Sequence, residues 1–367
     1  MNTVEMVNPP QEIKFNIFSK LPVKTLGRFK CVCKEWLNII SDPYFQRLHL
    51  ERSKKNPQLF LLDQANDADE DEDENRRPQL VQLSAMNMEG ELSYIARGFM
   101  IGYIHMIPSG HGLVCLINQG VFYIFHPSIK RSIRLPEVQS SAFQGVHAGF
   151  GYIQSRNEYK LVHLFDADQT HLCYKIKCEI ITLTDGGNGR IAFDSWRQIE
   201  DECPFIVSGR GVFAYNRFYW IIWEACHPTE EVSIISLDLE TETFESIPHP
   251  NYTSYLEDNN ISLVELEGQL CLIDTFAYPP VTDIWVLTDP VNKIWVKQHR
   301  IDLTALEGFD DELTEITVHG CKNGELIISS QQESLDYYNL SGQFFRKGKN
   351  LNLQADTGIC LYIDNFF

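Results

Sequence analysis

The spacing of hydrophobic residues divides the chain into two parts, with the change near residue 56. In the first part, Ile13, Ile17 and Leu21 recur every four positions, on one face of a helix that Pro22 then ends. We expect three or four short helices in all, the later ones running through Leu26 and Phe29, through Val32, Cys33, Trp36, Leu37 and Ile40, and over residues 43–50 behind a capping Asp42. Helices this short are marginal alone, so the module needs a partner or a neighbouring domain to cover its apolar side.

From about residue 57, apolar residues alternate with polar ones or run in short bursts between Gly, Asn, Asp and Pro, as β-strands do. Similar groups of strands recur at residues 112–136, 212–248, 263–299 and 324–346. Their spacing, roughly 40–50 residues, is typical of four-stranded propeller blades. Other groups fall at 57–106 and 149–199, and a strand at 359–363 would help to close the ring. The sequence predicts an all-β propeller of six blades, with seven blades or an open sandwich as alternatives.

An acidic block, Asp67 to Glu74, separates two strand-like runs that begin at Pro57 and Pro78. Like charges repel one another and cannot bury themselves. We therefore predict that residues 67–77 form a disordered loop between two paired strands.

The charge is distributed unevenly between the two parts. The chain carries a net charge of −19 at pH 7, of which residues 1–55 contribute +5 and the remainder −24. Such an acidic protein is a poor match for nucleic acid. A basic module on an acidic body favours two surfaces with different partners, although a drift of charge along the chain would give the same numbers.

No secretion signal is recognised, and no run approaches the roughly 20 apolar residues of a membrane span. The ten cysteines are scattered singly along apolar runs, as reduced cysteines are. We expect a soluble protein of the cytoplasm, the nucleus or both, with no membrane partner.

Motifs for catalysis or cofactor binding are not found. The glycine-rich stretch Gly186 to Gly189 follows one strand and precedes another, which is typical of a hairpin turn. His171, Cys173 and Cys178 could be drawn as a metal cluster, but lone cysteines on strands are more often core residues. We predict a non-catalytic protein without a metal or a cofactor.

The first fifty residues resemble the plant F-box. The resemblance rests on four motifs in their usual order: Leu21-Pro-Val-Lys24, Arg28-Phe-x-Cys-Val32, Lys34-x-Trp36 and Ile40-Ser-Asp-Pro43. Pro9 stands where the motif usually has leucine, which removes one apolar contact.

By this resemblance, the module would dock a Skp-type adaptor that links it to a cullin and a RING protein. The adaptor-binding residues carried over by position are Pro10, Ile13, Ile17, Leu21, Pro22, Leu26, Val32, Cys33 and Trp36. Large apolar groups in so small a module also favour an interface. The alternative is that Ile17, Leu26 and Trp36 fill the core of the module itself.

The second part resembles the plant F-box-associated domain, which is kelch-like. The residues that carry this looser resemblance are Gly112-Leu-Val-Cys-Leu116, His126-Pro127, Leu135-Pro136, Gly149-Phe-Gly-Tyr152 with Tyr159-Lys-Leu-Val162, and Asp238-Leu239 with Phe244 and Ile247-Pro248. We thus expect an F-box over residues 5–52 and a propeller over residues 57–367.

Together, the two resemblances imply the substrate-recognition subunit of a Skp–cullin–F-box ubiquitin ligase, which captures an unidentified target protein. The connections at residues 223–231, 250–258 and 274–282 are candidate target contacts, because they are long and mix aromatic with charged residues. The runner-up is a propeller that binds a glycan or another small molecule and carries a vestigial F-box. An enzymatic propeller would need three polar side chains that converge in a central channel.

Overall fold

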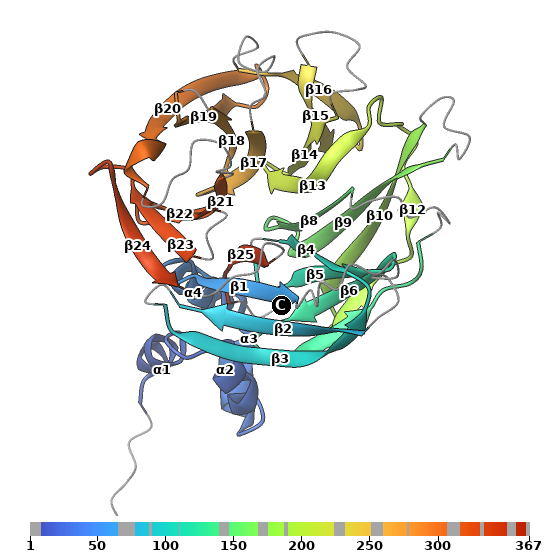
Figure 1. Cartoon of the computed structure of the whole chain (residues 1–367). Coiled ribbons are helices and arrows are strands. Elements are labelled where there is room, and N and C mark those ends of the chain that lie inside the picture. The colour runs from blue at the N-terminus through green and yellow to red at the C-terminus, as the bar shows by residue number, and fades with distance from the viewer. Residues whose placement is uncertain are drawn as a thin grey trace, which may run out of the picture.

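Four short helices precede a ring of β-sheets in the computed structural model of the chain (Figure 1). It describes residues 9–64, 78–87, 90–109, 111–138, 147–167, 175–186, 190–223, 232–250, 260–276, 279–306, 316–330, 334–350 and 357–364. The predicted disordered loop at 67–77 lies outside these residues. The strands on either side of it, β1 (Gln58–Gln64) and β2 (Pro78–Met86), pair antiparallel as predicted.

The helices are α1 (Gln11–Phe18), α2 (Val23–Phe29), α3 (Lys34–Ser41) and α4 (Pro43–Lys54). The pattern of apolar residues predicted their order correctly. Two boundaries differ: α1 ends before Leu21, and α3 begins after Val32 and Cys33. Within the described residues, no helix is long and apolar enough to span a membrane.

Four sheets have four strands each. The first has the order β25-β1-β2-β3 and the second β4-β5-β6-β7. The other two are β17 to β20 and β21 to β24, in sequence order. Their remaining strands are β3 (Leu92–Ile101), β4 (Ile104–Pro108), β5 (Val114–Asn118), β6 (Val121–His126), β7 (Arg131–Arg134), β17 (Asn260–Leu266), β18 (Gln269–Phe276), β19 (Val281–Asp289), β20 (Ile294–Asp302), β21 (Ile316–Lys322), β22 (Glu325–Ser330), β23 (Ser334–Asn339), β24 (Phe344–Asn350) and β25 (Gly358–Tyr362), with the 3-10 helix η3 (Leu303–Ala305) after β20.

The fifth sheet has nine strands and corrects the predicted count of six separate blades. It runs β11-β10-β9-β8-β13-β14-β15-β16, with β12 beside β10, because β8 and β13 form a parallel bridge between Gly149 and Gly211. Its strands are β8 (Ala148–Ile153), β9 (Glu158–Asp166), β10 (Ile176–Asp185), β11 (Ile191–Phe193), β12 (Arg197–Gln198), β13 (Val207–Ala214), β14 (Arg217–Ile222), β15 (Val232–Asp238) and β16 (Phe244–Pro248). The propeller itself is confirmed, as four four-stranded blades and one fused sheet.

Glycines allow this fusion. A Cβ atom on Gly149 would lie 2.6 Å from the ring of Phe218, and one on Gly211 would lie 2.6 Å from Trp220. The two aromatic rings occupy the space that side chains would need, so glycine is required at both bridging positions. The spacing of apolar residues carries no signal for such a contact between neighbouring blades.

The ring is closed by β25, which pairs with β1 although the two lie at opposite ends of the chain. Cys360 of this strand is buried with Phe60 and Met106 in one apolar cluster. This confirms the predicted closing strand. Burial decreases from the inner to the outer strands of the propeller. All six residues of the inner strand β8 are buried, whereas the outer strands β3 and β20 are largely exposed.

Candidate functional site

Three aromatic side chains hold the helical module together. The ring of Trp36 lies 5.0 Å from that of Phe18 and 4.7 Å from that of Phe29, and Phe18 and Phe29 are 5.6 Å apart. Each ring comes from a different helix, so the cluster joins α1, α2 and α3. Leu26, Ile39, Ile40 and Phe45 complete a small core around Phe18.

Polar contacts fix the helices against one another. Lys14 pairs with Glu35, which joins α1 to α3. Arg52 of α4 donates to the backbone oxygen of Asn16 at 3.0 Å and to its Oδ1 at 2.9 Å. As predicted, Asp42 caps α4, accepting from Tyr44 N at 2.7 Å and Phe45 N at 3.3 Å. These contacts explain how such short helices are held in register.

The predicted adaptor residues separate into three groups by exposure. Ile13, Ile17 and Val32 are 48, 53 and 60% exposed, and Pro10, Pro22 and Cys33 are exposed too. Leu21 and Trp36 are half-buried against the core. Leu26 is 0% exposed, so it fills the core of the module and cannot contact a partner from there. We therefore leave Leu26 out of the candidate surface, as the alternative interpretation anticipated for this residue.

Two other features of this surface did not emerge from the sequence. Leu37 and Tyr44 are also large exposed hydrophobic residues of the module. Leu37 of α3 lies one turn beyond Cys33, the residue that caps this helix, so helical spacing could have indicated it. Besides any contact with a partner, Cys33 caps α3, because its Sγ accepts a hydrogen bond from Trp36 N at 3.5 Å.

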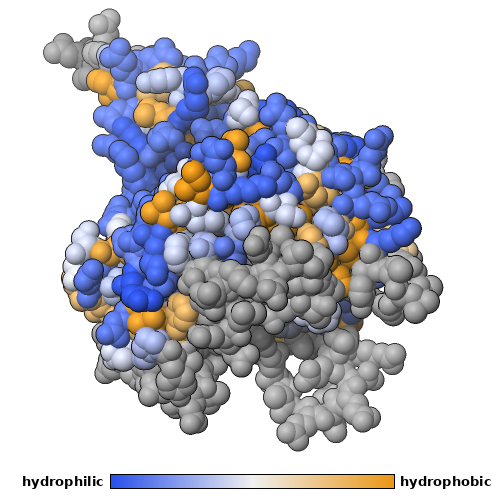
Figure 2. All heavy atoms as spheres, turned by 90° about the horizontal axis from the view of Figure 1, so that it is seen from above, coloured by the Kyte–Doolittle hydropathy of each residue, from blue (hydrophilic) through white to orange (hydrophobic). Residues whose placement is uncertain are grey.

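The module is joined to the propeller at the closing strand. Asp364, two residues beyond β25, accepts a hydrogen bond from Val23 N at 3.1 Å with its Oδ2. Its Oδ1 accepts from Ser128 Oγ and, at 3.1 Å, from the Tyr362 hydroxyl. The carboxylate thus caps the first turn of α2 and ties it to two points of the ring. Figure 2 shows a narrower part of the molecule standing out from the broad propeller, with small apolar areas among hydrophilic residues.

The other end of the propeller carries the longer connections. Turns at the module's end are short, for example residues 215–216 between β13 and β14 and 267–268 between β17 and β18. Since neighbouring strands are antiparallel, residues 223–231 and 249–259 connect strands at the opposite end. The candidate target contacts at 223–231, 250–258 and 274–282 start there, and their central residues lie outside the described part of the chain.

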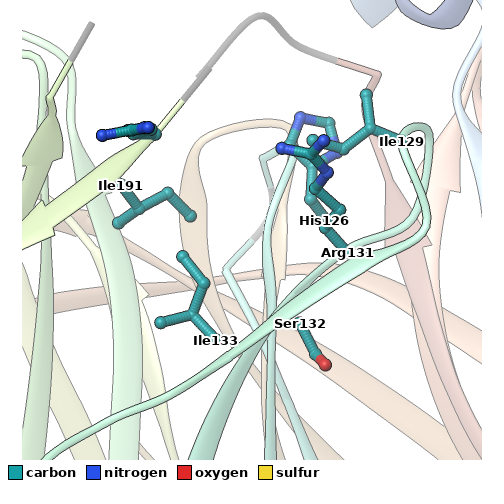
Figure 3. A pocket seen from close by; sticks show the side chains of 7 residues that line it. His126, Ile129, Arg131, Ser132, Ile133 and Ile191 are labelled. Atoms are coloured by element: carbon teal, nitrogen blue, oxygen red, sulfur yellow. The ribbon is translucent and has the colours of Figure 1, made fainter. Parts of the chain in front are cut away.

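A cavity of about 280 Å³ opens at the module's end of the propeller, between the β6–β7 turn and the start of β11. In Figure 3, His126 and Arg131 lie together on one side of it and Ile133 and Ile191 on the other. Burial lowers the pKa of His126 to about 4, so this imidazole is neutral at pH 7. The positive charge at this cavity comes from Arg131 and Arg190.

The glycine-rich stretch and Cys178 have structural roles in the described part of the chain. Gly186 and Arg190 lie between the antiparallel strands β10 and β11, where Gly186 N donates to Arg190 O at 2.8 Å, so the predicted hairpin is confirmed. Cys178 is buried, and burial raises the pKa of its thiol well above the usual value. His171 and Cys173 lie outside the described residues. Within the described ranges, no three His, Cys, Asp or Glu side chains gather as metal ligands would.

Comparisons with known proteins agree with this architecture. The F-box domain family matches residues 10–48, and the F-box associated beta propeller domain family matches residues 51–356. F-box protein At5g49610 of Arabidopsis thaliana is 22% identical over 363 residues, covering 92% of this chain and 90% of the relative. F-box/kelch-repeat protein At3g23880 of the same plant is 25% identical over 362 residues, covering 88 and 91%.

Among solved structures, the beta-propeller domain of the Trilobed protease from Pyrococcus furiosus is similar with a TM-score of 0.42 and 9% identity, covering 80% of this chain and 81% of that one. The propeller match to the F-box associated family spans most of the chain, and an F-box precedes it. The protein therefore belongs to the plant F-box proteins that carry an F-box associated beta propeller domain.

Proposed function

We propose that this protein is the non-catalytic substrate-recognition subunit of a Skp–cullin–F-box ubiquitin ligase. In this proposal, an F-box over residues 5–52 docks the Skp-type adaptor, and a propeller over residues 57–367 captures a target protein. The single observation that carries it is the exposed apolar surface of the module: Ile13 and Ile17 one turn apart on α1, with Val32 before α3.

The chemistry of that surface supports docking to another protein. Side chains of this kind gain free energy when a partner removes them from water, at about 25 cal/mol per Å². They sit on a module whose own core consists of a few residues around Phe18 and Leu26. A partner that covers Ile13, Ile17 and Val32 would complete an apolar layer that the chain leaves open.

The mechanism we propose is proximity. A target held beside a ubiquitin-loaded conjugating enzyme reacts as though it were part of the same molecule, which raises its effective concentration. The longer connections leave the end of the propeller opposite the module, so a bound target would not compete with the adaptor for space. The described cysteines are all free thiols, which suits the reducing cytoplasm or nucleus.

The test is the affinity of the purified full-length chain for a Skp-type adaptor, measured by calorimetry. We expect Ile17→Asp to weaken binding at least roughly tenfold, because a buried charge would replace an apolar contact. Ile17 is better suited than Leu21 or Trp36, whose loss would also disturb the core of the module.

The matched control is Val291→Asp, which places the same charge on an exposed residue of the propeller. Both variants should keep the unfolding temperature of the unmodified chain, since both sites face solvent. Adaptor binding that survives Ile17→Asp unchanged, or no binding by the unmodified chain, would overturn the proposal.

A further inference from the structure

A bulge in β13 directs an arginine into the centre of the propeller. The register between β13 and β14 shifts between Ser208 and Val212. Gly209 has φ +69°, in the left-handed region that L-residues rarely adopt, and Gly211 packs under Trp220. Between these glycines, Arg210 lines the central cavity. Bulges often redirect a side chain in this way beside a functional site.

The cavity has a volume of about 430 Å³ and is lined by residues of β13, β17, β21 and β25, with the end of β4. These strands surround the centre of the ring in Figure 1. Much of the wall is apolar, from Ile261, Leu263, Val318 and Leu361. A small molecule with an apolar body fits such a wall better than a sugar does, because a sugar needs many hydrogen bonds.

Within the part of the chain that the structure describes, the guanidinium of Arg210 has a backbone partner but no ion pair. One of its nitrogens, Nη1, donates to the backbone oxygen of Met106. No carboxylate of the described residues lies within ion-pair distance of it. Its side chain is exposed to the cavity but enclosed by the propeller, and this burial lowers the pKa of the guanidinium. The guanidinium nevertheless stays charged at pH 7. The cavity therefore holds a cation that has lost part of its hydration.

The other titratable groups at this cavity do not neutralise the arginine. Burial lowers the pKa of His319 to about 4, and its Nε2 lies 2.7 Å from Ser329 Oγ, so it is a neutral, hydrogen-bonded side chain at pH 7. Glu265 also lines the cavity, but it accepts from Gly268 N, and burial raises the pKa of its carboxyl. On the neighbouring strand β4, burial and the charge of Arg210 both lower the pKa of His105.

We propose that the central cavity of the propeller binds a small apolar carboxylic acid, with its carboxylate on Arg210 and its body on the apolar wall. A guanidinium pairs with the two oxygens of a carboxylate in a planar, bidentate arrangement. One cation matches one negative charge, which favours a monocarboxylate over a phosphate dianion. This site goes beyond the capture of a protein target and leaves the helical module free to dock its adaptor.

The experiment uses the full-length chain and the probes hexanoate, benzoate, neutral benzamide and inorganic phosphate, with calorimetry and thermal unfolding as readouts. A carboxylate probe should bind and raise the unfolding temperature. Benzamide should bind at least about tenfold more weakly than benzoate, because a charged hydrogen bond is lost. Arg210→Gln should remove the preference for the carboxylate, whereas Arg156→Gln, which changes an exposed arginine of the β8–β9 turn, should retain it.

Three outcomes would overturn the site: no binding of either carboxylate, equal binding of benzoate and benzamide, or binding that survives Arg210→Gln. Phosphate that binds more tightly than both carboxylates would overturn the ligand class. The unfolding temperature of Arg210→Gln without any probe separates a binding group from a brace between β13 and β4. A binding group predicts an equal or higher temperature, since an unpaired cation is removed, and a fall of several degrees would speak against the proposal.

Discussion

The helical module and the propeller bury their apolar residues to very different extents. The propeller closes on itself through β25, and its sheets enclose apolar clusters on both sides of most inner strands. The module has one small cluster around Phe18 and leaves Ile13, Ile17 and Val32 in water. The propeller also has exposed hydrophobic residues, such as Phe99 and Val291, but these lie on an outer strand and a turn.

This difference teaches how one chain divides two tasks. A closed ring can hold long connections and a central cavity without help from a partner, because its stability comes from within. A four-helix module of some forty residues cannot build such a core, and its missing burial is available for a partner. The link between them, Asp364, joins the marginal part to the closing strand of the stable one.

The largest expected effect comes from opening the ring. Deleting residues 357–367 removes β25, uncovers Phe60 on β1 and takes away the cap on α2. We expect a loss of more than about 5 kcal/mol in the free energy of unfolding, enough to prevent folding of a typical domain. Circular dichroism during heating would measure it. Cys360→Ser should cost far less than Cys360→Asp, which buries a charge at the same place. A cooperative, unchanged transition after the deletion would contradict the role of β25.

The second-largest expected effect comes from truncating a buried leucine in the core of each region. Leu26→Ala in the module and Leu326→Ala in β22 each truncate a fully buried leucine. Each should cost about 2–5 kcal/mol. In the module, this loss of free energy exceeds the stability that its small core supplies. Calorimetry should therefore show the module melting separately, at a lower temperature than the propeller. In the propeller, the same truncation should only lower the main transition. Equal behaviour of the two variants would mean that the module and the ring unfold as one unit.

Acid should weaken the propeller at pH values where the carboxylates are still charged. Burial lowers the pKa of His111, His126 and His319 to about 4, against about 6.5 in an unfolded chain. Between these values the unfolded chain binds protons that the folded chain does not, so the free energy of unfolding falls as the pH drops from 7 toward 4. We expect a loss of roughly 1–2 kcal/mol per histidine at pH 5, measured by urea unfolding. His126→Gln should flatten this dependence; an unchanged slope would contradict the assignment for that residue.

The smallest effect concerns the link itself. Asp364→Ala removes the cap on α2 and should cost about 1 kcal/mol. Hydrogen exchange at the Val23 amide should become faster while the propeller strands keep their protection. Asp302→Ala, which removes a cap from η3 within the propeller, is the matched control and should leave Val23 unaffected. Unchanged exchange at Val23 in Asp364→Ala would show that the module is positioned by other contacts.

Much of the fold could be predicted from local patterns. Spacing every four residues indicated α1, and alternation with turn residues indicated β5 to β7, β17 to β20 and β22 to β24, whereas β21 was not among the predicted strands. The predicted count of six blades was less accurate, because two blades fuse at Gly149 and Gly211. This fusion depends on how closely two backbones approach, and the spacing of apolar residues does not indicate that distance. The adaptor-binding residues of the module stay a prediction, in which the structure leaves Ile13, Ile17 and Val32 exposed and buries Leu26.

The burial of Leu26 could not be predicted from its spacing. In a short helix, residues one turn apart can face the core or the partner with the same spacing, and only the positions of the other helices decide which. The cap supplied by Asp364 and the cavity around Arg210 were equally invisible, since both join residues that are more than a hundred positions apart.

The sequence by itself determined the order of the elements, the division into a helical and a β part, and the family motifs, because these depend on neighbours within a few residues. The tertiary structure decided which apolar side chains stay in water, where the ring fuses, and that Arg210 lines a central cavity. Those outcomes depend on which surfaces meet when distant segments pack, and packing is a property of the whole chain.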